Sequence, residues 1–112
     1  MKIYHNPRCS KSRETLQILN DNDQNPEIIL YLENLPSKAE LKSILKKLEI
    51  PAEKLIRKSE PIFKEKYKNK NLSEDQWIDA MLRYPKLIER PIVIEGNKAV
   101  LGRPPENVLT LI

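Results

Sequence analysis

The apolar positions near the start of this 112-residue chain alternate between strand-like and helix-like patterns. The apolar pair Ile3-Tyr4 predicts a short strand at 2–4, and an apolar side along 10–22 predicts a helix. The nearly continuous apolar run at 27–32 predicts a second strand that is buried on both faces of its sheet. A strand, a helix and a strand within about 30 residues form a βαβ unit. We therefore expect the two strands to be parallel.

Helical spacing and capping residues dominate the middle of the chain. Serines followed three residues later by Glu or Gln form capping boxes at Ser37 and Ser73, which mark the starts of two helices. The first of these helices has apolar residues at helical spacing: Leu41, Ile44, Leu45 and Leu48. Shorter helices are expected at 51–56 and 61–67. Together these segments predict a helical insert at about 37–85.

The C-terminal part of the chain returns to strand patterns. Apolar runs at 91–94 and 99–101 flank a turn that contains Gly96, which predicts an antiparallel hairpin, and a last helix is expected at 106–112. The complete order is βαβ, a helical insert, then ββα. This order predicts an α/β, thioredoxin-like fold, with a mixed four-stranded sheet flanked by helices in a single domain, residues 1–112.

Composition narrows the class of protein without indicating an activity. The chain is 39% hydrophobic and 32% charged, which is typical of a soluble globular protein. No apolar run approaches the roughly 20 residues of a membrane span, and the first residues lack the apolar core of a signal peptide. The single cysteine excludes an internal disulfide and a cysteine-only metal site. It also favours the cytoplasm, where thiols stay reduced.

Positive charge is concentrated in the middle of the chain. The net charge is +4, and residues 38–70 contain eleven Lys or Arg and five Glu. Such an excess could attract nucleic acid or an acidic partner. The lysines are nevertheless spread at helical spacing, as on a solvated helix face. We therefore expect neither a nucleic-acid partner nor a membrane partner.

The clearest chemistry lies between the first strand and the first helix, in the run His5-Asn6-Pro7-Arg8-Cys9-Ser10-Lys11-Ser12-Arg13. Cys9 is the only cysteine and His5 the only histidine. A cysteine at a helix start faces unpaired N–H groups and the positive end of the helix dipole, which both favour a thiolate. Arg8, Lys11 and Arg13 add positive charge, which lowers a thiol pKa further. An inert, buried cysteine is the alternative, and the polar flanks disfavour it.

This run resembles the signature of the glutaredoxin-coupled arsenate reductase family, His-Asn-Pro-x-Cys-x-x-Ser-Arg, and fills every fixed position of it. The resemblance continues along the chain at three further places: Arg57, Arg90-Pro91 and Gly102-Arg103-Pro104. It implies the same thioredoxin-like fold, a catalytic Cys9, and an oxyanion held by Arg57, Arg90 and Arg103. Folds of this kind carry a cis-proline facing the cysteine, and Pro91 is the candidate.

The resemblance also implies a reaction. Arsenate binds to the arginines, the Cys9 thiolate attacks arsenic, glutathione and glutaredoxin resolve the adduct, and arsenite is released. Glutathione is then a co-substrate, and no bound cofactor is implied. His5 is expected either to help keep Cys9 ionised or only to close the first strand. Ser12 can donate its hydroxyl towards the sulfur, and Arg13 either screens the site or faces solvent.

Two other functions fit parts of the sequence. One is a Spx-type regulator that binds RNA polymerase, because such proteins are similar in fold. Many of them carry Cys-x-x-Cys, whereas the last position here is Ser12. The other is a related thiol oxidoreductase acting on another oxyanion, because a thiolate and three arginines do not distinguish arsenate from similar anions. If Cys9 is catalytic, it cannot resolve its own adduct, so the second thiol must come from another molecule, because the chain has no other cysteine.

Overall fold

The computed structural model describes every residue from Met1 to Ile112. The chain forms two compact units, and the second interrupts the first in sequence. The first unit combines Met1–Asn34 with Arg90–Ile112, and the second is Leu35–Glu89. The second unit therefore occupies the place of the helical insert predicted at about 37–85.

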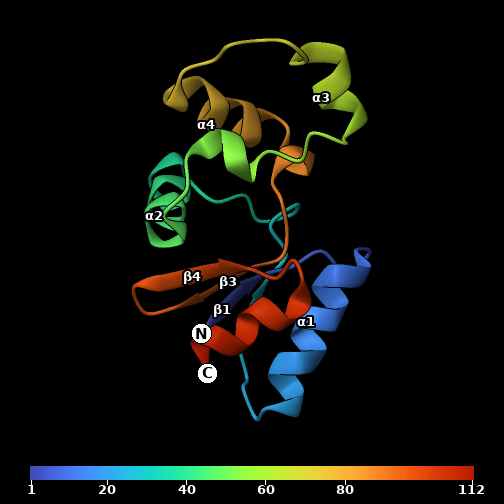
Figure 1. The fold of residues 1–112 in the computed structure, drawn as a ribbon, viewed down its shortest axis with the longest axis vertical. Helices are drawn as coiled ribbons and strands as arrows, with labels where there is room; N and C mark the ends of the chain where they lie inside the picture. The colour runs from blue at the N-terminus through green and yellow to red at the C-terminus, as the bar shows by residue number, and fades with distance from the viewer. The chain divides into compact units, whose positions relative to one another are not determined.

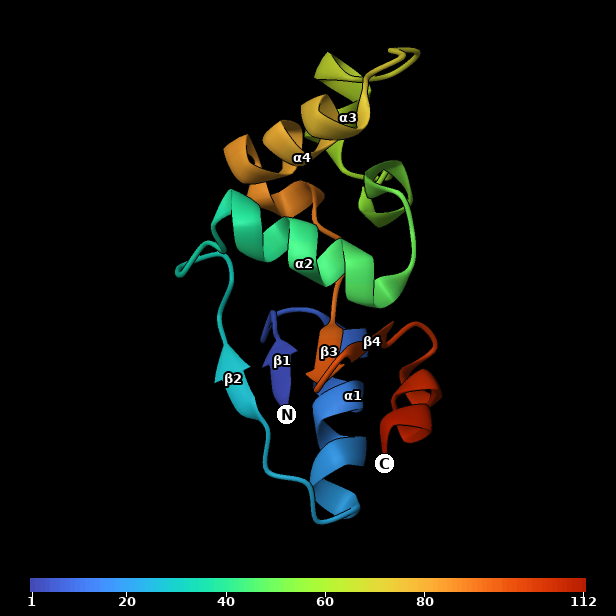
Figure 2. The same ribbon diagram turned by 90° about the vertical axis from the view of Figure 1, so that its left-hand side faces the viewer.

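The first unit contains four strands and two helices: β1 (Lys2–Tyr4), α1 (Ser10–Asp21), β2 (Glu27–Ile29), β3 (Ile92–Glu95), β4 (Lys98–Leu101) and the 3₁₀ helix η3 (Pro105–Leu111). The strands form one sheet in the order β2-β1-β3-β4 (Figure 2). β1 is parallel to β2 and antiparallel to β3, and β4 is antiparallel to β3. This mixed sheet with its helices confirms the predicted α/β, thioredoxin-like fold class.

The core of the first unit lies between its sheet and its two helices. Figure 1 shows α1 and η3 together on one side of the sheet. Four side chains with no exposed surface meet there, one each from β1, α1, β3 and η3: Ile3, Leu19, Val93 and Val108. Burying a side chain of this size stabilises a fold by about 1.5–3 kcal/mol. This apolar layer fixes α1, and with it the loop that leads into α1.

The strand predicted at 27–32 is wrong in length and in burial. β2 ends at Ile29, and the residues that follow form a turn in which Tyr31 is buried. β2 is an edge strand of the sheet, and Ile28 is 50% exposed. The apolar run therefore continued because a turn residue is buried, and not because the strand is covered on both faces.

The predicted hairpin is confirmed, with Gly96 in the turn at a φ of +60°, a conformation that favours glycine. The last helix forms one residue earlier than expected and is a 3₁₀ helix. The Arg90–Pro91 peptide bond is cis, as proposed for Pro91, and so is Arg103–Pro104. Both cis bonds follow an arginine of the expected oxyanion set.

The second unit is entirely helical: α2 (Lys38–Leu48), the 3₁₀ helix η1 (Ala52–Leu55), α3 (Pro61–Lys66), α4 (Glu74–Arg83) and the 3₁₀ helix η2 (Pro85–Leu87). Both predicted helix starts are correct. The Ser37 hydroxyl accepts the Glu40 N–H at 3.1 Å, and both bonds of the capping box form between Ser73 and Gln76. None of the helices in either unit combines the length and the apolar composition needed to span a membrane.

Candidate active site

Cys9 lies in the first unit, at the point where the loop after β1 becomes α1. It is the N-cap residue of α1, with extended backbone angles. Its N–H donates to the Asn6 carbonyl at 3.0 Å, and its carbonyl accepts the Arg13 N–H at 3.0 Å. The side chain is partly exposed. The thiol is therefore held by the backbone at a helix start and stays accessible, as the sequence predicted.

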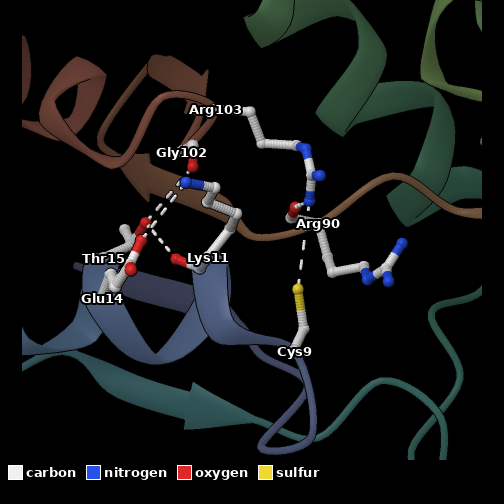
Figure 3. A network of polar contacts seen from close by, with 7 residues as sticks. All are labelled: Cys9, Lys11, Glu14, Thr15, Arg90, Gly102 and Arg103. Atoms are coloured by element: carbon white, nitrogen blue, oxygen red, sulfur yellow. Dashed lines mark hydrogen bonds and ion pairs between the residues drawn. The ribbon is translucent and has the colours of Figure 1, made fainter.

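The surroundings of Cys9 favour the thiolate. Burial raises the pKa of the Cys9 thiol, but the Ser12 N–H, the positive charge of Arg90, the Lys11 N–H and a contact with Arg103 lower it, and the net pKa lies below the ordinary value. Figure 3 shows the sulfur directed towards Arg103, whose Nη1 lies 3.9 Å away. Helix N–H groups and two cations thus stabilise the same anion.

Two of the three predicted arginines meet at Cys9. The Arg103 Nη1 that faces the sulfur also donates to the Arg90 carbonyl at 3.1 Å. The Arg90 side chain is buried, at 7% exposure, whereas Arg103 is exposed. Arg57 belongs to the second unit, where its Nη1 lies 3.2 Å from Glu60 Oε2. Arg90 and Arg103 are therefore the arginines that the first unit itself brings to the thiol.

His5 acts on the loop through a serine. His5 Nδ1 and Ser12 Oγ share a buried hydrogen bond of 2.6 Å, and Ser12 Oγ accepts the Asn6 N–H at 3.0 Å. The Ser12 hydroxyl therefore hydrogen-bonds residues of the loop and does not contact the sulfur in the way that was predicted. It is the Ser12 N–H that stabilises the Cys9 thiolate. Burial and the charge of Arg13 lower the pKa of His5. A neutral imidazole adds no positive charge, and the hydrogen bond to Ser12 is what connects His5 to the first turn of α1.

The Arg13 side chain stabilises the loop that precedes α1. Its Nη1 donates to the Pro7 carbonyl at 2.8 Å, while the Asn6 side chain accepts the Arg8 N–H at 3.0 Å. These bonds run across the turn that carries Cys9. Arg13 thus does more than face solvent, because it ties the first turn of α1 to the preceding residues.

The sequence assigned no role in the site to two residues of this region, Thr15 and Gly102, although Gly102 stands in the Gly102-Arg103-Pro104 segment of the resemblance. Both are buried, and they lie against each other (Figure 3). A signal for Gly102 was available, because the chain has only two glycines and the hairpin turn accounts for the other one. Thr15 had no such signal, because a threonine inside a helix carries no distinctive pattern.

A cavity of about 320 Å³ adjoins the loop on the side of the turn that follows β2. Its lining comes from both segments: His5, Asn6, Pro7, Arg8, Leu30, Leu32 and Glu33. It combines a cation, an anion and apolar surface next to the residues that lead to Cys9. No group of three or more His, Cys, Asp or Glu side chains is placed to hold a metal ion.

Comparisons with known proteins agree with this geometry. The model of the ArsC family matches residues 4–111. An uncharacterized Escherichia coli K12 protein, YfgD, is 50% identical over 100% of this chain and 96% of its own length. A Haemophilus influenzae protein named arsenate reductase is 46% identical over 98% of this chain and 97% of its own length.

A solved structure is similar over the same extent. The structure titled arsenate reductase from Vibrio cholerae has a TM-score of 0.94 and 45% sequence identity to this chain. The match covers 99% of this chain and 96% of that one. The whole of both units is therefore shared with proteins of one family.

Proposed function

The chain belongs to the ArsC family, and from this premise we propose that it is an arsenate reductase in which the Cys9 thiolate attacks arsenic. One observation carries the proposal. Cys9 lies at the start of α1 with a lowered pKa, and Arg103 Nη1 lies 3.9 Å from its sulfur. A thiolate beside a guanidinium group is suited to attack the central atom of a bound oxyanion.

The arginines bind the substrate in this proposal. Arsenate is a tetrahedral dianion near neutral pH, and guanidinium groups bind such oxyanions through charged, parallel hydrogen bonds. Arg90 and Arg103 are placed beside Cys9. We assign Arg57 as the third arginine of the set, on the resemblance described above. Their charge offsets the negative charge that gathers on the oxygens during attack.

Reduction of arsenate to arsenite requires two electrons, and in the proposed steps external thiols supply them. Sulfur–arsenic bond formation expels one arsenate oxygen as water after protonation, and arsenic stays in the +5 state. A glutathione thiolate then attacks the Cys9 sulfur, so that an S–S bond forms and the S–As bond breaks with its electron pair moving to arsenic. Arsenite leaves, and glutaredoxin reduces the mixed disulfide to free Cys9. The external thiol is required because the chain has no second cysteine.

The cavity beside the loop supports glutathione as that thiol. Glutathione carries two carboxylates and one ammonium group. Arg8 and Glu33 line the cavity together with Leu30 and Leu32, so each type of charge on glutathione has an opposite charge available. Arg8 directly precedes Cys9 in the chain, which brings the cavity next to the reacting residue.

The deciding experiment measures arsenite release from arsenate by the purified chain, with glutathione and glutaredoxin present together and each omitted in turn. We expect release from the native chain and none from Cys9→Ser, whose hydroxyl is a much weaker nucleophile. Release by the native chain that does not require glutathione would reject the proposed thiol. No release at all, or equal release from Cys9→Ser, would reject the reductase itself.

A separate measurement tests the related hypothesis of a thiol enzyme for another oxyanion. Arsenate and phosphate are compared for their ability to protect Cys9 from alkylation. Protection by arsenate together with arsenite release supports the reductase. Protection by both anions without arsenite release would favour an enzyme acting on a different oxyanion.

A further inference from the structure

The segment that follows β4 approaches α1 closely at Gly102, the residue directly before Arg103. A Cβ placed on Gly102 would lie 2.7 Å from Pro91 Cγ and closer still to Thr15 Oγ1. Neither neighbour is the end of a long, flexible side chain. The Gly102 N–H also donates to the Pro91 carbonyl at 2.9 Å. Any larger residue at this position must push the chain away from α1.

Thr15 joins this glycine to the turn of α1 that holds the thiolate. Its hydroxyl lies 2.8 Å from the Lys11 carbonyl and 3.4 Å from the Gly102 carbonyl (Figure 3). Lys11 is one of the two residues whose N–H groups stabilise the Cys9 thiolate. Thr15 has no exposed surface. It therefore lies between the thiolate-binding turn and the backbone that carries Arg103.

The backbone at Arg103 is also held from the opposite side. Asn107 Nδ2 donates to the Arg103 carbonyl at 3.1 Å and to the Leu101 carbonyl at 3.2 Å. Gly102 is tied to Pro91 and Thr15, and the Pro104 carbonyl accepts the Asn107 N–H at 3.0 Å, so the residues on both sides of Arg103 have fixed partners. The exposed arginine side chain thus extends from a backbone that has little freedom to move.

We propose that Gly102 and Thr15 are positioning residues that set the distance between the Arg103 guanidinium group and the Cys9 sulfur. Neither is required to touch substrate. Gly102 lets the backbone before Arg103 come close to α1. Thr15 fixes where along α1 that backbone lies. The assignment of an oxyanion to Arg103 rests on the proposed function, whereas the placement of Arg103 against the sulfur does not.

The test uses four single variants of the full chain, the double variant Gly102→Ala/Arg103→Ala and two readouts. Gly102→Ala removes the close approach, Thr15→Val removes the hydroxyl while keeping the shape, Thr15→Ser restores the hydroxyl, and Arg103→Ala removes the arginine itself. The matched control is Gly96→Ala, because Gly96 has a φ of +60° but nothing within 4 Å of an added Cβ. The readouts are the Cys9 pKa, from thiolate absorbance, and protection of Cys9 from alkylation by arsenate.

We expect Gly102→Ala to raise the Cys9 pKa by about one unit, as loss of a nearby cation does. We also expect it to weaken arsenate protection about tenfold, as loss of one charged hydrogen bond does. Adding Arg103→Ala to Gly102→Ala should cause no further change, because both act through one contact. Thr15→Val should shift the pKa in the same direction, and Thr15→Ser should restore it. Gly96→Ala should lower stability and leave both readouts unchanged.

A folded Gly102→Ala variant with the native Cys9 pKa would overturn the proposal, and so would full additivity with Arg103→Ala. If Gly102→Ala does not fold, Thr15→Val decides by the same pKa. Failure of arsenate to protect the native chain would count against the proposed function alone, because the pKa readout uses no arsenate.

Discussion

The two units of this molecule bury different kinds of side chain. In the second unit every buried residue is apolar, and none of its charged residues is buried. The buried polar and charged residues of the whole chain all belong to the first unit: His5, Ser12, Thr15 and Arg90. All of them lie in the loop and helix around Cys9 or at the start of the segment that returns to it.

Burying polar groups is unfavourable unless they are hydrogen-bonded. Three of these residues in the first unit make such bonds: His5 and Ser12 share one of 2.6 Å, and the Thr15 hydroxyl donates to the Lys11 carbonyl at 2.8 Å. Such bonds fix a single arrangement of the loop, which an apolar core would not specify. The difference between the units indicates that the first is built to position Cys9 and the second to be stable. Each prediction below tests that division.

The largest change in stability is expected from the second unit. Met81 in α4 has no exposed surface, so Met81→Ala should lower the free energy of unfolding by about 2–5 kcal/mol through the cavity that it leaves. The Cys9 pKa of the folded variant should equal that of the native chain. Denaturant unfolding and a thiolate titration measure the two quantities.

Met81→Leu is the matched control, because a volume-conserving swap should cost less than about 1.5 kcal/mol. A shift of the Cys9 pKa in folded Met81→Ala would show that packing in the second unit also tunes the thiol. The interpretation that only the first unit positions Cys9 would then be incorrect.

A smaller loss of stability, but one coupled to the thiol, is expected at Ser12. Ser12→Ala leaves a buried imidazole and the Asn6 N–H without their partner, which should cost about 1–3 kcal/mol. Because the loop loosens around Cys9, the Cys9 pKa should rise as well. Ser43→Ala removes an exposed serine from α2 and should change neither quantity. Loss of stability in Ser12→Ala at an unchanged Cys9 pKa would separate loop packing from thiolate stabilisation.

Local patterns were sufficient to predict most elements of both units. The βαβ unit, the Gly96 hairpin and the helix starts at Ser37 and Ser73 follow from spacing, turn residues and capping. The predicted burial of β2 failed because position within a sheet is a long-range property. An apolar run shows that its residues are apolar, but it does not predict which other elements pack over them.

The site divides in the same way. Cys9 and its loop could be recognised from contiguous residues, since a helix start creates its own electrostatics. That Arg103 lies beside Cys9 depends on contacts 94 residues apart in the chain. Only the family resemblance indicated that meeting in advance. The close packing of Thr15 against Gly102 depends on the distance between two elements, which no pattern in a single sequence encodes.

Arg57 offers a sharper test, because it is the one proposed oxyanion ligand that belongs to the second unit. Arg57→Ala should weaken arsenate protection of Cys9 about tenfold, as expected for one charged hydrogen bond. Arg83→Ala is the control, since it removes the same charge from an exposed position in the same unit. It should weaken protection less than about twofold, the effect of an exposed charge. Equal losses would mean that net charge, and no defined contact, attracts the anion.

The smallest effect expected is a pH dependence of stability that arises only in the first unit, which holds the single histidine. The pKa of His5 is lowered from 6.5 by burial and by Arg13. Above pH 6.5 the imidazole is neutral in both the folded and the unfolded chain, and its contribution to stability is complete. As the pH falls from 6.5 towards the folded pKa, the unfolded chain binds the proton more readily, so stability is lost.

His5→Gln keeps a polar side chain beside Ser12 but does not titrate, so it should remove this loss. The measurement is the urea midpoint of the native chain and of His5→Gln between about pH 7.5 and 5.5, a range above the titration of ordinary carboxylates. The native midpoint should fall more steeply with acid than that of the variant. Parallel curves would mean that the first unit accepts a charged His5 at no cost, and that the imidazole is not held neutral against Ser12.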